Sequence, residues 1–208
     1  MTKKQADGRL DPGTVVRAAL DLLDHQGLDA LSTRAVADRL GVRMNTVLWH
    51  VKTKARLLEL MADAVMGGIA LDDLPAAPDP RAREIVRRYR RALLTHRDGA
   101  ALVAGTYPAE PHTLRVAEAL VGALLETGLD ERAAAWTTWT LTYFTLGLTQ
   151  EEQAAEPDSQ TERLTAAVSP TDHPALHRTL GHLAPENFDE RFEYGLAGIL
   201  RPPTGTGT

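Results

Sequence analysis

Apolar residues at helical spacing near the N-terminus predict a first helix. The pair Asp11-Pro12 is typical of a helix start, because Asp accepts hydrogen bonds from the first turn and proline fits the first helical position. The stripe that follows consists of Val16, Ala19, Leu20 and Leu23. Gly27 is expected to end this helix, since glycine enters the left-handed conformation of a helix end without steric cost.

Two short helices are predicted directly after it. Ser32 or Thr33 can cap a helix over residues 34–40, which Gly41 would end. A further short helix is expected over about 44–50. Two short helices joined by a glycine-led turn are the arrangement of a helix-turn-helix.

The rest of the chain is predicted to be helical as well. Thr53 can cap a longer helix, and three prolines within residues 74–80 interrupt the pattern after it. Further helices are expected at about 81–96, 100–105, up to 128, 130–152, 174–183 and 187–200. The polar, proline-containing residues 153–172 are interpreted as a loop. No segment alternates as a strand would, so the predicted fold class is all-α.

Composition is that of a globular protein with an uneven charge. Hydrophobic residues make up 43% and charged residues 25% of 208 residues, and there is no cysteine. Residues 1–60 hold ten Lys/Arg and seven Asp/Glu, a net charge of +3, against −8 for the remainder. No apolar run is long enough for a membrane helix or a signal peptide. Cytoplasmic localisation without membrane contact is expected, and the basic N-terminal part suits nucleic acid.

The block from Thr33 to Lys54 has the features that a DNA-binding helix-turn-helix requires. Its first helix offers a small, apolar face, its turn contains glycine, and its second helix begins with polar residues that could face the major groove. A pair of helices without any special role is the alternative that this pattern alone leaves open.

The segment LSTRAVADRLGVRMNTVLWHVKTKARLLELMADAV resembles the tetracycline repressor family, most clearly in Trp49-His50-Val51-Lys52 and Lys54. The segments HRDGAALVAGTYP and YFTLGLTQEEQ extend the resemblance over nearly the whole chain. It implies an N-terminal three-helix helix-turn-helix DNA-binding domain and a larger helical ligand-binding and dimerisation domain. The expected parts are a flexible tail (1–10), the DNA-binding domain (11–60), the ligand-binding and dimerisation domain (61–201) and a disordered tail (202–208).

The resemblance also implies which residues contact DNA. They are Thr33, Arg34, Arg43, Met44, Asn45, Thr46, Trp49, His50, Lys52 and Lys54. Arginine can pair with guanine and asparagine with adenine, while Lys54 at a helix start suits phosphate. For Trp49, packing that fixes the helix is an equal alternative. Leu48 and Met44 replace a tyrosine and a glutamine of the family, so the operator sequence cannot be carried over.

In the second domain, the family's prototype binds a magnesium–tetracycline chelate through a histidine, a threonine and a distant glutamate. Thr106 and Glu151 match, but Val103 replaces the histidine and Tyr107 an arginine. One carboxylate opposite a valine is a poor magnesium site, so neither metal nor cofactor is predicted. A solvent-exposed charge is the alternative role for Glu151. The expected effector residues are Leu102, Val103, Thr106, Tyr107, Trp136, Trp139, Thr140, Tyr143, Gly147 and Glu151.

The aromatic residues of the long helix allow two interpretations. Trp136, Thr140, Tyr143 and Gly147 share one helical face, with Trp139 nearby. Aromatic side chains with a few hydroxyls suit an apolar ligand pocket, and they suit a helical dimer interface equally well. The sequence does not choose between these two roles.

No enzyme motif is present in the chain. It lacks HExxH, GxSxG, a Walker loop and GxGxxG, and the histidines at 173 and 177 are interpreted as surface or interface residues and not as metal ligands. The prediction is a homodimeric regulator, expected to be a repressor, that binds a palindromic double-stranded operator and leaves it on binding a small, mostly apolar effector. The alternatives are a DNA-binding regulator without an effector, or a ligand-binding protein with a vestigial DNA-binding domain.

Overall fold

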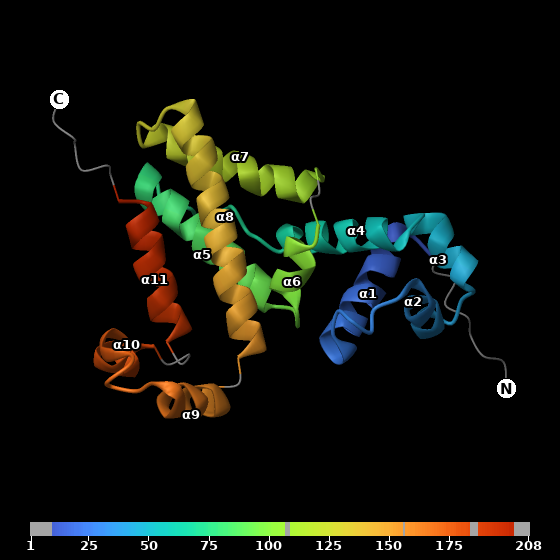
Figure 1. Ribbon diagram of the computed structural model, residues 1–208. Coiled ribbons are helices and arrows are strands. Elements are labelled where there is room, and N and C mark those ends of the chain that lie inside the picture. Colours follow the sequence, from blue (N-terminus) through green and yellow to red (C-terminus); the bar gives the residue numbers. More distant parts are fainter. Residues whose placement is uncertain (1–9, 107–108, 156, 184–186, 202–208) are drawn as a thin grey trace. The chain divides into compact units, whose positions relative to one another are not determined.

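The computed structural model describes residues 10–106, 109–155, 157–183 and 187–201 (Figure 1). Helices and their connections make up these residues, and no strand occurs among them, so the all-α prediction is confirmed. The helices are α1 (Pro12–Gln26), α2 (Thr33–Leu40), α3 (Met44–Val51), α4 (Lys54–Gly67), α5 (Pro78–Leu94), α6 (Gly99–Ala104), α7 (Pro111–Glu126), α8 (Glu131–Ala154), α9 (Pro157–Ala167), α10 (Pro174–Thr179) with the 3-10 turn η1 (Leu180–His182), and α11 (Phe188–Ile199).

The chain forms two compact units, and the first is not continuous in sequence. Unit 1 comprises the described residues up to Ala70 together with Arg91–Val116, and unit 2 comprises Leu71–Arg90 and the described residues from Ala117 onward. The functional boundary at residue 60 that the sequence suggests stays a prediction, because these units are defined by packing alone. The tails at 1–9 and 202–208 and the residue Tyr107 lie outside the described residues.

Unit 1 is built around α1. The predicted cap is confirmed, since Asp11 Oδ1 accepts a hydrogen bond from Thr14 N at 2.6 Å, and α1 ends at Gly27 with a φ of 80°. The apolar stripe of α1 packs against α2, α3 and α4. The residues fully withdrawn from solvent there include Val15, Ala19, Leu23, Val36, Val47, Val51, Leu57, Met61 and Ala62. A helix-turn-helix therefore rests on a common core with the helix before it and the helix after it.

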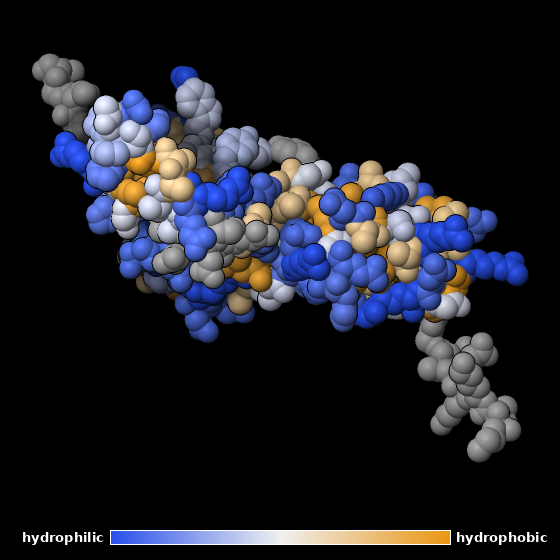
Figure 2. All heavy atoms as spheres, turned by 60° about the horizontal axis from the view of Figure 1, so that its bottom comes forward, coloured by the Kyte–Doolittle hydropathy of each residue, from blue (hydrophilic) through white to orange (hydrophobic). Residues whose placement is uncertain are grey.

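In unit 2, α8 and α11 lie side by side and contact each other (Figure 1). Phe144 of α8 and Phe192 of α11 stack with ring centroids 6.0 Å apart. Leu141 and Leu196 are buried in the same unit, as are Ile85 and Leu124. On the face drawn in Figure 2, apolar residues appear as patches among hydrophilic ones. No helix of the described residues has the length and apolarity that crossing a bilayer requires.

The structure corrects two predictions about prolines. Residues 153–172 were expected to be a loop, but 157–167 form α9, and Pro157 occupies its first position, where a missing N–H costs nothing. The helix expected from about residue 81 begins earlier, at Pro78, so two of the three prolines in 74–80 lie within its first turn. In both segments the prolines start a helix where they were expected to break one.

Candidate nucleic-acid interface and effector residues

The turn between α2 and α3 is fixed by local backbone chemistry. Ser32 Oγ accepts a hydrogen bond from Ala35 N at 3.1 Å and thereby caps α2. Gly41 ends α2 with a φ of 66°, in the left-handed region that favours glycine. Arg43 follows in an extended conformation immediately before α3. The two helices and the glycine turn expected of a helix-turn-helix are thus confirmed.

One side of α3 is buried and the other is open to solvent. Val47 and Val51 are fully buried where α3 packs on α1 and α2, whereas Val42 in the turn is half-buried. Most of the predicted DNA contacts are exposed, namely Arg34, Arg43, Met44, Asn45, Thr46, Trp49, Lys52 and Lys54. Thr33 and His50 are half-buried. The structure therefore gathers hydrogen-bond donors and cations on and beside the free face of α3.

Trp49 projects from this face instead of packing beneath it. Its side chain is 69% exposed, and the His50 ring meets it edge-on with centroids 4.9 Å apart. Lys52 Nζ lies 5.6 Å from the centroid of the indole and donates a hydrogen bond to Trp49 O at 2.9 Å. Such exposure favours contact with a partner over the alternative in which Trp49 only fixes the helix.

The start of α4 presents a second cationic position. Thr53 Oγ1 accepts a hydrogen bond from Arg56 N at 3.0 Å, which confirms the predicted cap. Lys54 is the first residue of α4 and is exposed. Because a helix N-terminus carries partial positive charge, a free lysine there suits a phosphate group.

Three interactions tie α4 and the residues just after it to the start of α7 and to Glu110 before it. Arg56 pairs with Glu110, which lowers the pKa of that carboxyl and raises the pKa of the guanidinium. Asp63 Oδ1 accepts hydrogen bonds from Thr113 N at 2.8 Å and from Thr113 Oγ1 at 2.9 Å. Arg115 Nη2 donates to Ile69 O at 2.8 Å. Sequence reasoning missed these ties, because their partners lie 46 to 54 residues apart.

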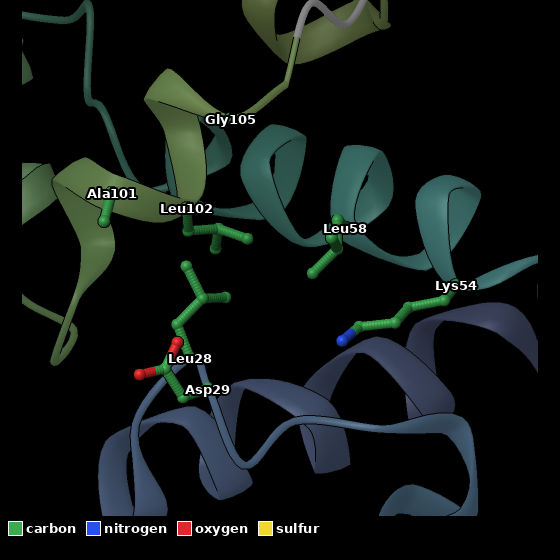
Figure 3. A pocket seen from close by; sticks show the side chains of 7 residues that line it. All are labelled: Leu28, Asp29, Lys54, Leu58, Ala101, Leu102 and Gly105. Atoms are coloured by element: carbon green, nitrogen blue, oxygen red, sulfur yellow. The ribbon is translucent and has the colours of Figure 1, made fainter.

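The predicted effector residues divide between the two units. In unit 1, Leu102 is buried and lines a cavity beside α4 (Figure 3). Val103 and Thr106 are half-buried, and the Thr106 hydroxyl donates a hydrogen bond to Val103 O at 3.1 Å. The remaining residue of this group, Tyr107, is not among the described residues.

The second group lies on α8 and is exposed throughout. It consists of Trp136, Trp139, Thr140, Tyr143, Gly147 and Glu151. The rings of Trp139 and Tyr143 stack with centroids 5.4 Å apart, and the Arg132 guanidinium lies 4.1 Å from the Trp136 ring centroid. These residues form the single helical face that the spacing predicts. Whether a ligand or a second copy of the chain covers this face stays a prediction.

Unit 2 also contains an ion-pair cluster that the sequence did not indicate. Arg90 of α5 is 7% exposed and donates from Nη2 to Glu152 Oε2 at 2.7 Å and from Nη1 to Asp189 Oδ1 at 2.6 Å. Burial alone would lower the pKa of Arg90, but these hydrogen bonds outweigh it and raise the pKa. The guanidinium also lies 5.0 Å from the Phe192 ring centroid. The acidic residue at the end of α8 that makes a structural ion pair is therefore Glu152, whereas the predicted effector residue Glu151 is exposed.

A buried helix-turn-helix core beneath an exposed basic face, with a larger helical unit in the same chain, is the architecture of a DNA-binding transcription regulator. Residues 15–61 match the family described as bacterial regulatory proteins, tetR family, and residues 75–201 match the tetracyclin repressor-like C-terminal domain. The chain is 37% identical over 195 residues to the class A tetracycline repressor protein from transposon 1721 of Escherichia coli, covering 92% of this chain and 89% of that protein. It belongs to the tetracycline repressor family.

Solved structures agree with this assignment. The ActR protein of Streptomyces coelicolor in complex with actinorhodin matches with a TM-score of 0.84 at 28% identity, over 92% of this chain and 95% of that chain. TetR from Acinetobacter baumannii AYE matches with a TM-score of 0.68 at 31% identity, over 92% and 95%. Proteins of this family are transcriptional regulators and not enzymes, which confirms that part of the prediction.

Proposed function

We propose that this chain is a homodimeric repressor that binds a palindromic operator through α2 and α3. A small, flat and largely apolar effector would release it from DNA. The observation that carries the proposal is the exposure of Arg43, Asn45, Thr46 and Trp49 on the side of α3 opposite its buried valines. A recognition helix needs this division, because one side must hold the fold while the other reads bases.

Dimer formation is supported by the exposed face of α8 and by its neighbour α11. In a symmetric dimer, two such helices from each copy would form a four-helix bundle. Two recognition helices about 34–36 Å apart would then match successive major grooves of a two-fold symmetric site. Effector binding would favour a dimer with a different spacing, which requires unequal affinity for the two states.

The proposed effector class follows from side-chain chemistry. The Val103 side chain cannot ligate magnesium at the position where the family's prototype has a histidine. Trp136, Trp139 and Tyr143 offer aromatic contact area, and Thr106 offers a hydroxyl. The complex of ActR with actinorhodin supports an organic effector for a relative of this fold.

Variants of two cations test the operator role. Arg43→Ala should relax base preference at one position by about 1–3 kcal/mol, whereas Lys54→Ala should weaken specific and random DNA alike and reduce the salt slope by about one. Arg39→Ala is the matched control, because it removes an equal charge from an arginine that pairs with Asp21. Fluorescence anisotropy with the palindromic fragment upstream of the gene, at several salt concentrations, measures both effects. Equal losses on specific and random DNA for Arg43→Ala would contradict the assignment of α3.

Titration of the bound operator tests the effector. Flat aromatic natural products should release the DNA equally with and without a chelator, and magnesium–tetracycline should not release it at low micromolar concentration. Release by magnesium–tetracycline that a chelator abolishes would overturn the proposed pocket chemistry. A complex that no compound dissolves would favour a regulator without an effector, and the absence of any complex would favour a vestigial DNA-binding domain.

A further inference from the structure

A small cavity lies within unit 1, between the α1–α2 connection, the first half of α4, and α6 (Figure 3). Its volume is about 230 Å³. Leu28, Leu58 and Leu102 point toward one another across it, and Ala101 and Gly105 complete the wall on the side of α6. Two of its lining residues have predicted roles, Leu102 in effector binding and Lys54 in DNA contact, but neither role assigns an occupant to the cavity itself.

The wall nearest α1 is held in place by hydrogen bonds independent of any ligand. Leu28 N donates to Asp98 Oδ2 at 2.8 Å, and Arg97 N donates to Asp24 Oδ1 at 3.1 Å. His96 Nδ1 lies 3.0 Å from Asp24 Oδ2. Leu102 is 1% exposed, so the opposite wall is part of the core. A preformed cavity saves a ligand the cost of ordering its site.

One cation reaches the opening of this cavity. The extended side chain of Lys54 carries its ammonium toward the space between the leucines, whereas the Asp29 carboxylate lies beyond Leu28 (Figure 3). No ion pair among the described residues involves Lys54 or Asp29. An apolar space with a single unpaired cation directed toward it is complementary to a molecule that has an apolar tail and one negative end.

We propose that this cavity binds a small aliphatic monocarboxylate, with the carboxylate on Lys54 Nζ and the tail among Leu28, Leu58 and Leu102. The volume equals that of about eight water molecules in the liquid, which is also the number of non-hydrogen atoms in a six-carbon carboxylate, about eight. Typical pockets for small-molecule ligands have volumes of about 300–1,000 Å³, so the occupant of this cavity must be smaller than a typical effector. For a molecule of this size a dissociation constant of about 0.1–3 mM is expected.

A carboxylate bound in the cavity would weaken DNA binding, because it would occupy the ammonium group of Lys54. A lysine that neutralises a bound carboxylate cannot neutralise an operator phosphate at the same time, so the carboxylate and the DNA would oppose each other. This consequence rests on the proposed function, in which Lys54 contacts the operator. Binding of the carboxylate itself does not rest on it, and it is measured without DNA.

Isothermal titration of the full chain with hexanoate tests the site directly. Hexanoate should bind in the expected range, and hexan-1-ol, which has the same tail without the charge, should bind at least about threefold more weakly. Lys54→Gln should weaken hexanoate binding about three- to tenfold, while Arg39→Gln should leave it unchanged. Equal binding of hexanoate by the Lys54→Gln variant and the unmodified chain would overturn the proposal.

Two further variants test whether a loss of hexanoate binding reflects the site itself or a misfolded protein. Ala101→Leu fills the cavity from a half-buried position and should abolish binding, and its unfolding midpoint shows whether the fold is intact. Asp29→Asn removes a nearby negative charge and should strengthen hexanoate binding about twofold, a gain that loss of structure cannot produce. If Asp29→Asn has no effect and Ala101→Leu still binds, the carboxylate lies elsewhere.

The operator supplies a separate readout. Hexanoate should weaken operator binding by the unmodified chain up to about tenfold at saturation, and it should have no effect on Lys54→Gln. Hexanoate that binds the chain without changing operator affinity would preserve the site and refute the role of Lys54 on DNA. Hexanoate that does not bind would refute the site and leave the operator role intact.

Discussion

Replacing Gly195 by alanine should destabilise unit 2, because glycine at this position lets α11 approach α8 closely. An alanine Cβ there would lie 2.2 Å from Phe144 Cζ and 2.5 Å from Phe144 Cε2. Carbon atoms that are not bonded pack at about 3.5–4.0 Å. The Phe144 ring is not free to swing aside, since it stacks on the buried ring of Phe192. Either the ring or the helix must therefore move.

Two opposing contributions set the size of the effect. Overpacking costs about 1–3 kcal/mol, whereas replacing glycine by alanine within a helix gains about 1 kcal/mol. The net loss for Gly195→Ala is thus about 0–2 kcal/mol. Gly198 lies in the same helix with no atom within 4 Å of a Cβ, so Gly198→Ala keeps only the gain. The two variants should differ by about 1–3 kcal/mol, which is the cost of overpacking alone.

Urea unfolding followed by helical circular dichroism measures this difference. All variants are compared at one protein concentration, because the proposed dimerisation would add to apparent stability. Unchanged slopes indicate that only stability has changed. Phe144→Leu, combined with Gly195→Ala, should recover part of the loss through a coupling of about 0.5–3 kcal/mol. Equal stability of the Gly195→Ala and Gly198→Ala variants, with no coupling to position 144, would refute the close packing of α8 on α11.

Two further predictions concern charged groups. Asp63→Ala leaves the Thr113 N–H and hydroxyl without their acceptor and should lower the free energy of unfolding by about 1–3 kcal/mol, while Asp38→Ala at an exposed site should change it by less than about 0.5 kcal/mol in the same urea assay. Hydrogen bonds from Arg87 hold the pKa of Glu193 below its ordinary value of 4.5. The stabilisation of the folded chain by these hydrogen bonds is complete above pH 4.5 and is lost as the pH falls through the lowered pKa of Glu193. Glu193→Gln removes this dependence, so it should reduce the drop in urea midpoint between about pH 6 and about pH 3. A drop as large as that of the unmodified chain would contradict the Arg87–Glu193 pairing.

Sequence reasoning succeeded where neighbouring residues determine the backbone. Asp11, Ser32 and Thr53 each cap a helix by accepting a hydrogen bond from the residue three positions later, and Gly41 ends α2 by its own left-handed conformation. These features depend on local chemistry, which the order of residues contains directly.

The same reasoning failed where distant residues decide the outcome. Arg90 meets Glu152 and Asp189 across 62 and 99 positions, and no local pattern distinguishes it from the other arginines of α5. In the sequence, Asp63 looks like an ordinary surface residue of α4, because its hydrogen-bond partner Thr113 lies 50 residues away. The loop expected at 153–172 shows a different failure, because proline was interpreted as a helix breaker where it begins α9.

The ties between α4 and residues 110–115 limit how this regulator could be recombined with its relatives. An exchange of the first seventy residues alone would separate Arg56 from Glu110 and Asp63 from Thr113, and it would pair α4 with an α6 from a different protein. Residues 91–116 belong to the same compact unit and would have to travel with the helix-turn-helix. The DNA-binding part of this protein must therefore be transferred as two chain segments. A chimera with a single junction after α4 would lack the contacts between α4 and residues 110–115.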